Sequence, residues 1–352
     1  MSVERFEVAP DYTISRLIKG GWHLAGGHGD VDREQAIADM AVFVEKGITT
    51  FDCADHYTGV EEMIGDFRLR YPELAKQVQV HTKFVPDYDK LGNVKKDYVE
   101  GVIDRSIRRL KVERLDIVQY YWWDPDGKPG FVETGLMLKE LQDAGKIARI
   151  GVSNFNTRQM KALVDGGVPI ATNQPQYSPV DRRPEAQLIP FSQDNGIVQL
   201  CYGTLAGGFF SADWLGKPEP FDPFPNRSLT KYKLIIEDFG GWLLFQELLA
   251  TMKKVGDKHG VTVALVALRW ILDRPNVGAA IVGATSARHV DENLKVFSFA
   301  LDAEDNAAIE AVLSRRTGPN GDCYNLERDK TGRHGRIMRY NQNALEGGAP
   351  RA

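Results

Sequence analysis

Three short strand-like runs follow one another in the middle of the chain: ARIGV (148–152), IATNQ (170–174) and IVQLCY (197–202). Short apolar runs of this kind are typical of parallel strands that are buried on both faces. The stretches between them, 158–165 and 184–195, have the length and the apolar spacing of helices. The segment therefore predicts two consecutive strand–helix–strand units of a parallel sheet.

The same alternation extends along nearly the whole chain, in which eight strand-like runs can be assigned. These runs are Thr13–Ile18, Ile48–Asp52, Val78–Lys83, Leu115–Tyr121, Ala148–Val152, Ile170–Gln174, Ile197–Tyr202 and Ala279–Val282. Eight strands alternating with helices predict an α/β fold of the (β/α)8 TIM-barrel type. An open, doubly wound sheet is the alternative, but no GxGxxG motif follows any of the runs.

Residues 1–316 are expected to form this barrel as a single domain, because no linker composition or fixed-period repeat divides them. Two stretches depart from the alternation. The proline-rich stretch 207–239 is expected to be a long loop after the seventh strand, and loops of that length often serve as lids. Residues 317–352 show no periodicity and are expected to form a C-terminal tail, which either covers the active-site mouth or lies on the surface as a strap.

The composition is that of an ordinary globular protein. Of 352 residues, 43% are hydrophobic and 26% are charged, with a formal net charge of −4, which excludes a disordered chain. The lack of a dense basic cluster argues against nucleic acid as a partner, and no apolar stretch approaches the ~20 residues that would span a membrane. The sequence carries no signal that sets an oligomeric state.

Three features of the sequence bear on location and metals. The N-terminus is charged and lacks the apolar segment of a secretory signal. Cys53, Cys201 and Cys323 are odd in number and lack metal-ligand spacing, which suits a reducing compartment. The seven histidines show no paired spacing on one helix or strand. A cytoplasmic protein without a metal site is therefore expected.

Polar residues stand at or just beyond the ends of the strand-like runs, where the catalytic groups of a barrel gather. Asp52 ends the second run, Tyr57 follows five residues later, and Lys83 ends the third run. A lysine ammonium beside a phenol is expected to lower the pKa of the tyrosine from its usual value near 10. Such a tyrosine could protonate an oxyanion as it forms, which carbonyl reduction requires. The alternative is a solvated tyrosine beside a structural Lys–Asp pair.

A second group of polar residues stands at or just beyond the ends of the fifth, sixth and seventh runs. Ser153, Asn154 and Gln174 are neutral hydrogen-bonding side chains that could together fix a carboxamide, which has one acceptor and two donors. Tyr202 could then stack on a flat ring. The alternative is that each of these residues caps a strand or forms a turn.

These residues belong to a set of motifs that the chain shares, in order, with one known superfamily. The motifs are FDCADHY (51–57), TK (82–83), LD (115–116), GVSNF (151–155), NQ (173–174), ALRW (267–270) and VGAT (282–285). Over about residues 13–315, the chain resembles the aldo-keto reductases. The resemblance implies a (β/α)8 barrel that binds NADP(H) without a Rossmann motif and reduces a small-molecule aldehyde or ketone.

The resemblance also implies roles for individual residues. Asp52, Tyr57 and Lys83 would be three members of the catalytic tetrad, with Tyr57 as the proton donor. Ser153, Asn154 and Gln174 would hold the nicotinamide carboxamide, while Tyr202 stacks on its ring. The other implied cofactor contacts are Gly21, Trp22 and again Asp52 near the nicotinamide, Gly203, Leu205 and Gly207 along the pyrophosphate, and Gly283, Thr285, Arg288, His289, Glu292 and Asn293 at the adenosine end.

The fourth tetrad position departs from the superfamily pattern. A histidine usually stands five residues after the Asp of the fourth strand, and this chain has Tyr121 there. A phenol donates one hydrogen bond but cannot exchange a proton near neutral pH as imidazole does. A barrel that reduces an activated C=C bond, or one that acts as a nucleotide-sensing subunit like those of potassium channels, is therefore an alternative. His56 or His81 could compensate for the missing histidine, although both are more typical of core or rim positions.

Two further expectations concern the two ligands. Gly283 and Ala284 replace a Lys-Ser pair that binds the 2′-phosphate in many members; Thr285, Ser286 and Arg288 could serve instead, so NADPH is favoured over NADH. Aromatic residues near the site, Trp22, Tyr120, Trp122 and Trp123, suggest an aromatic wall. An aryl or apolar substrate in contact with Trp22, Tyr57 and Trp122 is expected.

Overall fold

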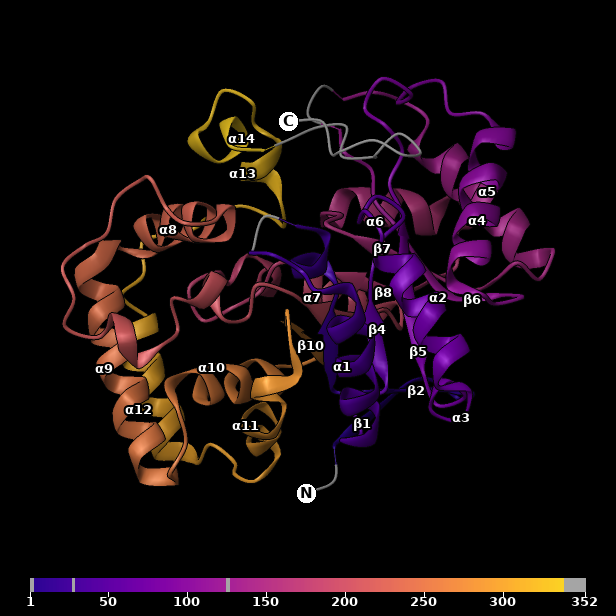
Figure 1. Ribbon diagram of the computed structural model, residues 1–352. Helices are drawn as coiled ribbons and strands as arrows, with labels where there is room; N and C mark the ends of the chain where they lie inside the picture. The colour runs from indigo at the N-terminus through magenta and orange to yellow at the C-terminus, as the bar shows by residue number, and fades with distance from the viewer. Residues whose placement is uncertain (1–2, 27–28, 125–126, 339–352) are drawn as a thin grey trace.

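A closed barrel of eight parallel strands forms the centre of the computed structural model, which describes residues 3–26, 29–124 and 127–338 (Figure 1). Each strand pairs with the next along the chain, and the last pairs with the first. The barrel strands are β3 (Leu17–Gly20), β4 (Thr50–Asp52), β5 (Gln79–Phe84), β6 (Leu115–Tyr120), β7 (Ile147–Ser153), β8 (Ile170–Gln174), β9 (Val198–Cys201) and β10 (Val277–Gly283). The predicted (β/α)8 barrel is confirmed.

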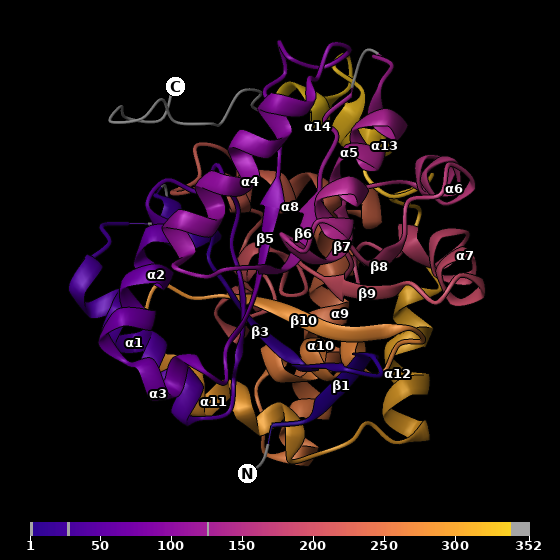
Figure 2. The ribbon, with the colours of Figure 1, turned by 90° about the vertical axis from the view of Figure 1, so that its right-hand side faces the viewer.

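Helices surround the barrel and bury their apolar faces against it (Figure 2). They are α1 (Arg33–Glu45), α2 (Val60–Arg70), α3 (Pro72–Ala75), α4 (Lys96–Leu110), α5 (Phe131–Asp143), α6 (Thr157–Asp165), α7 (Leu188–Asp194), α8 (Arg227–Phe239), α9 (Gly241–His259), α10 (Val263–Leu272), α11 (Val290–Leu294) and α12 (Ala303–Leu313). Within the described ranges, no helix is both long and apolar enough to cross a membrane.

The pairing register brings the polar strand ends together. Gly20 pairs with Asp52, and Asp52 pairs with His81, so Lys83 lies two residues further toward the mouth on the same face of β5 as His81. Ser153 pairs with Gln174 at the ends of β7 and β8. Residues that are distant in sequence therefore meet at one end of the barrel.

The predicted first strand, Thr13–Ile18, is wrong in its bounds. Strand β1 (Arg5–Ala9) pairs antiparallel with β2 (Tyr12–Ser15), and the barrel strand β3 begins only at Leu17. The chain turns at Ser15, whose hydroxyl donates to the Leu17 carbonyl at 2.7 Å. The hairpin lies at the end of the barrel opposite the mouth (Figures 1 and 2).

The predicted loop 207–239 is shorter than expected. It contains two short 3-10 turns, Ala206–Gly208 and Ala212–Trp214, and residues from Arg227 onward form α8. The Asn226 side chain caps this helix by accepting a hydrogen bond from the Leu229 amide at 3.0 Å. The prolines before Asn226 hid the start of the helix in the sequence.

The C-terminal segment contains α13 (Asn325–Arg328) and α14 (Arg333–Arg336). Both views place these helices at the mouth end of the barrel (Figures 1 and 2). We call residues 317–338 the C-terminal strap. The rest of the predicted tail, 339–352, lies outside the described residues.

Candidate active site

A cavity of about 690 Å³ opens at the carboxyl ends of the barrel strands, within the size range of small-molecule sites. Most of the predicted site residues line it. These are Trp22, Asp52, Tyr57, Lys83, Tyr121, Ser153, Asn154, Gln174, Tyr202, Gly203, Leu205, Gly207 and Gly283. The structure thus brings the two predicted polar groups and the glycine-containing loop to one site.

Lys83 is the centre of the first polar group. Its ammonium donates to both carboxylate oxygens of Asp52 and to the Cys53 carbonyl, each at 2.8 Å. It also lies 4.9 Å from the centroid of the Tyr57 ring. Asp52 and Lys83 are both about 95% buried, so the charge pair is held in a fixed geometry beside the phenol.

Burial has a larger effect on the pKa of Tyr57 than its charged neighbour. Desolvation raises the pKa of the phenol to about 12, and Lys83 opposes that rise only in part. Lys83 thus lowers the pKa as predicted, but desolvation, which spacing in a sequence does not show, outweighs it and keeps the pKa above its usual value. Burial would lower the pKa of Lys83, but Asp52 and Tyr57 outweigh it and hold the pKa above its ordinary value, so the lysine remains charged.

The second polar group is joined to the first. The Gln174 side-chain amide donates to Asp52 Oδ1 at 2.6 Å, and the Ser153 hydroxyl lies 3.4 Å from Gln174 Oε1. Asn154 has a positive φ of 61° and accepts a hydrogen bond from the Tyr202 hydroxyl at 2.7 Å. These side chains form a neutral hydrogen-bonding wall next to an aromatic ring.

The loop after β9 needs glycine at two of the predicted positions. Gly203 and Gly207 have φ values of 70° and 65°, a region that disfavours other residues. A Cβ on Gly203 would lie 2.2 Å from the Tyr232 hydroxyl. Gly21 does not line the cavity; its amide donates to the Asp52 carbonyl at 2.8 Å, and a Cβ there would lie 2.6 Å from that oxygen.

Tyr121, which the sequence predicts to stand at the fourth tetrad position, lines the cavity with Trp123 and Tyr324. The rings of Tyr121 and Tyr324 pack edge to face with centroids 6.2 Å apart. Burial raises the pKa of Tyr121 far above its ordinary value. Tyr121 is therefore a neutral hydrogen-bonding group at neutral pH.

The prediction that Trp122 contacts substrate is wrong. Trp122 is fully buried against Tyr120 with ring centroids 6.1 Å apart, and neither residue lines the cavity. Trp123, the next residue, lines it instead. At the end of a strand successive side chains point to opposite faces, so an error of one residue reverses the assignment.

The two histidines that the sequence analysis placed near the site differ. His81 is fully buried, burial lowers its pKa to about 3, and it contacts the Tyr12 hydroxyl at 3.1 Å, so it is a neutral core residue. His56 lines the cavity, lies 3.1 Å from an Asp55 carboxylate oxygen, and packs edge to face against Tyr57.

The residues predicted for the adenosine end follow β10. Gly283 lines the cavity, whereas five others lie beyond its wall: Thr285, Arg288, His289, Glu292 and Asn293. Arg288 and His289 are hydrogen-bonded at 2.9 Å, and Glu292 forms an ion pair with Lys295 at 2.6 Å.

Several cavity residues were not predicted. Arg227, Ser228 and Lys231 come from α8, whose sequence was assigned to a loop, and Tyr324 comes from the C-terminal strap. Hydrophobic positions at 229, 232, 235, 236 and 239 in the sequence could have revealed this helix and its exposed side. In the part of the chain that the structure describes, no group of three or more His, Cys, Asp or Glu residues is placed to hold a metal.

A (β/α)8 barrel whose strand ends surround a buried lysine–carboxylate–phenol set has the features of a barrel enzyme. The sequence model of the family described as "Aldo/keto reductase family" matches residues 16–314 of this chain. The chain belongs to this family of oxidoreductases.

Individual relatives are similar to this chain along most of their length. The "Aldo-keto reductase YhdN" of Bacillus subtilis is 30% identical over 87% of this chain and 93% of its own. The "NADH-specific methylglyoxal reductase" of Escherichia coli is 26% identical over 84% of this chain and 93% of its own. Among solved structures, the glycerol dehydrogenase AKR11B4 from Gluconobacter oxydans has a TM-score of 0.74 and 27% identity, covering 91% of this chain and 98% of that one.

Proposed function

We propose that this protein reduces the carbonyl group of a small aldehyde or ketone, with NADPH as the hydride donor and Tyr57 as the proton donor. The observation that carries the proposal is the buried Asp52–Lys83 pair with the Tyr57 ring 4.9 Å from the ammonium, at the wall of the cavity. Membership of the aldo/keto reductase family supports it.

The second polar group fits the nicotinamide end of the cofactor. Ser153, Asn154 and Gln174 provide both donors and acceptors, as a carboxamide requires, and Tyr202 offers an aromatic face beside them. A nicotinamide held by these residues would supply the hydride that carbonyl reduction requires. Thr285, Ser286 and Arg288, which follow β10, would hold the 2′-phosphate, for which a guanidinium is well suited.

The electrostatics suit proton donation by Tyr57. A pKa of about 12 keeps the phenol protonated at neutral pH, as an acid must be before it acts. The Lys83 ammonium then stabilises the phenolate that remains after the proton has moved to the carbonyl oxygen. Tyr121 can donate a hydrogen bond to the same oxygen, but its raised pKa keeps it from exchanging the proton.

The test is the rate at which the purified protein oxidises NADPH or NADH when aromatic and aliphatic aldehydes are added. We expect Tyr57→Phe to lower kcat by about 10²- to 10⁴-fold, the usual contribution of a general acid, with the dissociation constant of NADPH unchanged. Tyr71→Phe, a tyrosine that does not line the cavity, is the matched control and should behave as the wild type.

Two results would contradict the proposal. Turnover that survives Tyr57→Phe would remove Tyr57 as the acid. Tight NADPH binding with reduction of an activated C=C bond, but of no aldehyde, would favour the specialised chemistry that the Tyr121 position suggests.

A further inference from the structure

Lys231 places a positive charge in the cavity wall, apart from the Lys83 pair. It lies on α8, and its ammonium is 5.2 Å from the ring centroid of Tyr202, 5.1 Å from that of Tyr324 and 5.6 Å from that of Tyr232. The contacts of this ammonium are therefore aromatic faces, which partly stabilise a cation. Among the residues that the structure describes, no carboxylate forms an ion pair with Lys231.

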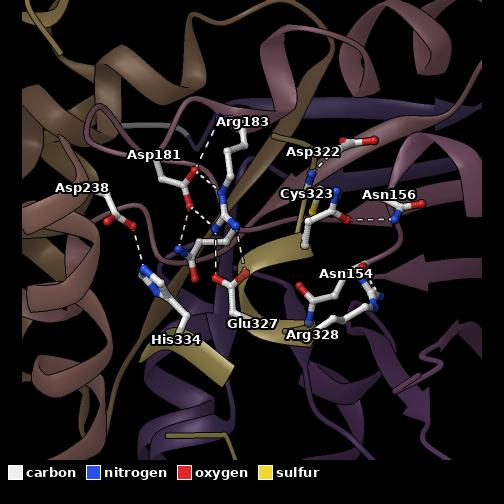
Figure 3. A network of polar contacts seen from close by, with 12 residues as sticks. Asn154, Asn156, Asp181, Arg183, Asp238, Asp322, Cys323, Glu327, Arg328 and His334 are labelled. Carbon is white, nitrogen blue, oxygen red and sulfur yellow. Dashed lines mark hydrogen bonds and ion pairs between the residues drawn. The ribbon is translucent and has the colours of Figure 1, made fainter. Parts of the chain in front are cut away.

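The two carboxylates that raise the pKa of Lys231, Glu327 and Asp181, are already bound by another cation. Arg183 donates to both oxygens of Glu327 at 2.8 and 2.9 Å and to both oxygens of Asp181 at 2.7 and 2.9 Å (Figure 3). All three side chains are almost completely buried. Their geometry is fixed by these paired contacts, so neither carboxylate is available to Lys231.

A lysine two residues further along α8 shows the contrast. Lys233 donates to Glu219 at 2.8 Å and to Glu237 at 2.6 Å, so its charge is neutralised within the protein. Lys231 has no such partners and faces the cavity. The charged residues that line this cavity are Lys83, Arg227 and Lys231 against Asp52 and Asp87. The cavity wall therefore has a cationic excess.

Lys231 remains mostly charged at neutral pH. Burial lowers its pKa to about 8, while Glu327 and Asp181 raise it and Arg183 lowers it further. A cation that is partly desolvated and lacks a carboxylate gains most from an anionic ligand, because that ligand restores the lost solvation.

We propose that Lys231 binds the anionic group, a carboxylate or a phosphate, of the carbonyl substrate, and that the enzyme therefore prefers anionic aldehydes or ketones. The inference rests on the proposed function. Its geometric basis is Tyr324, whose ring contacts both Lys231 and Tyr121. A carbonyl placed at Tyr57 and Tyr121 thus has Lys231 within reach of a group carried further along the same molecule. Trp22 and Trp123 provide aromatic surface for a flat spacer between the two ends.

The test compares two aldehydes of the same shape that differ in charge, 4-carboxybenzaldehyde and 4-formylbenzamide. We expect the wild type to prefer the acid, and Lys231→Met to lower kcat/KM for the acid by about 10- to 100-fold, as for the loss of one charged hydrogen bond. The amide and the dissociation constant of NADPH should be unaffected. Lys231→Arg should retain most of the preference, and Lys254→Met, which removes an exposed lysine of α9, is the matched control.

A binding measurement separates this inference from the proposed function. Titration calorimetry of the NADP⁺ complex with 4-methylbenzoate and 4-methylbenzamide needs no turnover. If neither aldehyde is reduced but 4-methylbenzoate binds more tightly and loses that advantage in Lys231→Met, the anion site stands and the proposed reaction fails. Equal binding of the two ligands, or an acid-to-amide ratio that Lys231→Met leaves unchanged, overturns the inference. Weaker binding of NADPH in Lys231→Met, with both aldehydes affected alike, also overturns it and assigns Lys231 to the cofactor phosphates.

Discussion

The two ends of the barrel carry additions to the eightfold repeat, and the additions differ in chemistry. At the end away from the active site, the β1–β2 hairpin packs apolar residues such as Ile14 against barrel residues that include Ile117 and Leu200. At the mouth, the C-terminal strap is held by polar contacts. Arg183 binds Glu327, and Arg328 donates to the Asn154 carbonyl at 2.6 Å.

The difference shows that the two ends of the barrel are held together by different interactions, and that only one of them bears on the site. Apolar packing at the hairpin end directs no group at a ligand. At the mouth, the buried ion pairs hold the strap so that Tyr324 packs against Tyr121, and they bind the carboxylates that could otherwise neutralise Lys231. At the hairpin end, substitutions that keep the volume of the apolar side chains should preserve stability. At the other end the positions of individual charges matter.

The largest effect is expected from breaking the buried network at the mouth. Arg183→Met would leave Asp181 and Glu327 buried without their cation, which costs about 3–5 kcal/mol of unfolding free energy. Denaturant unfolding measures this change. Arg315→Met removes an ion pair with Glu247 that lies on the surface and should change stability little. A loss in Arg183→Met no larger than in this control would show that the network does not hold the strap.

A somewhat smaller loss is expected at the opposite end. Ile14 is fully buried in the hairpin cluster, and Ile14→Ala should lower the unfolding free energy by about 3 kcal/mol. The kcat/KM of the folded protein should change little, because no hairpin residue lines the cavity, and only Ile281 and Tyr202 of the cluster do. A change in KM at a temperature where the variant is fully folded would disprove this separation of the two ends.

The smallest effect is expected at a helix cap that joins the strap to the barrel. Asn156 caps α6 by accepting from the Gln159 amide at 2.9 Å, and it donates to Asn325 of the strap at 2.9 Å. Asn156→Ala should cost about 1–2 kcal/mol, and Thr262→Ala, which removes the cap of α10 alone, about 1 kcal/mol. Limited proteolysis should cut the strap faster in Asn156→Ala only. Equal protection of the strap in both variants would show that the Asn325 contact is dispensable.

The sequence was sufficient to predict the barrel because its repeat is local. Each strand and helix has its own apolar pattern, and register follows from closure of the barrel. Errors occurred where the pattern is not local. The hairpin merged with the first barrel strand in the prediction, since only Arg16 separates Tyr12–Ser15 from Leu17–Gly20 and no Gly, Pro, Asn or Asp marks the turn.

The site was predictable to the extent that strand ends determine it. Asp52 and Lys83 end neighbouring strands and therefore meet at the mouth. Tyr324 and Lys231 enter the cavity through contacts across long sequence separations, for which the repeat gives no signal. The direction of the pKa shift of Tyr57 depends on burial, which spacing alone does not reveal.

The hydrogen bond from Gln174 to Asp52 has a consequence for redesign of this barrel. The Gln174 amide, which is suited to bind the coenzyme, donates a hydrogen bond to the Asp52 carboxylate. Asp52 in turn holds the Lys83 ammonium beside Tyr57. Replacing Gln174 to alter coenzyme affinity would therefore also disturb how readily the phenol gives up its hydrogen. Selectivity and acidity at this mouth must be engineered together.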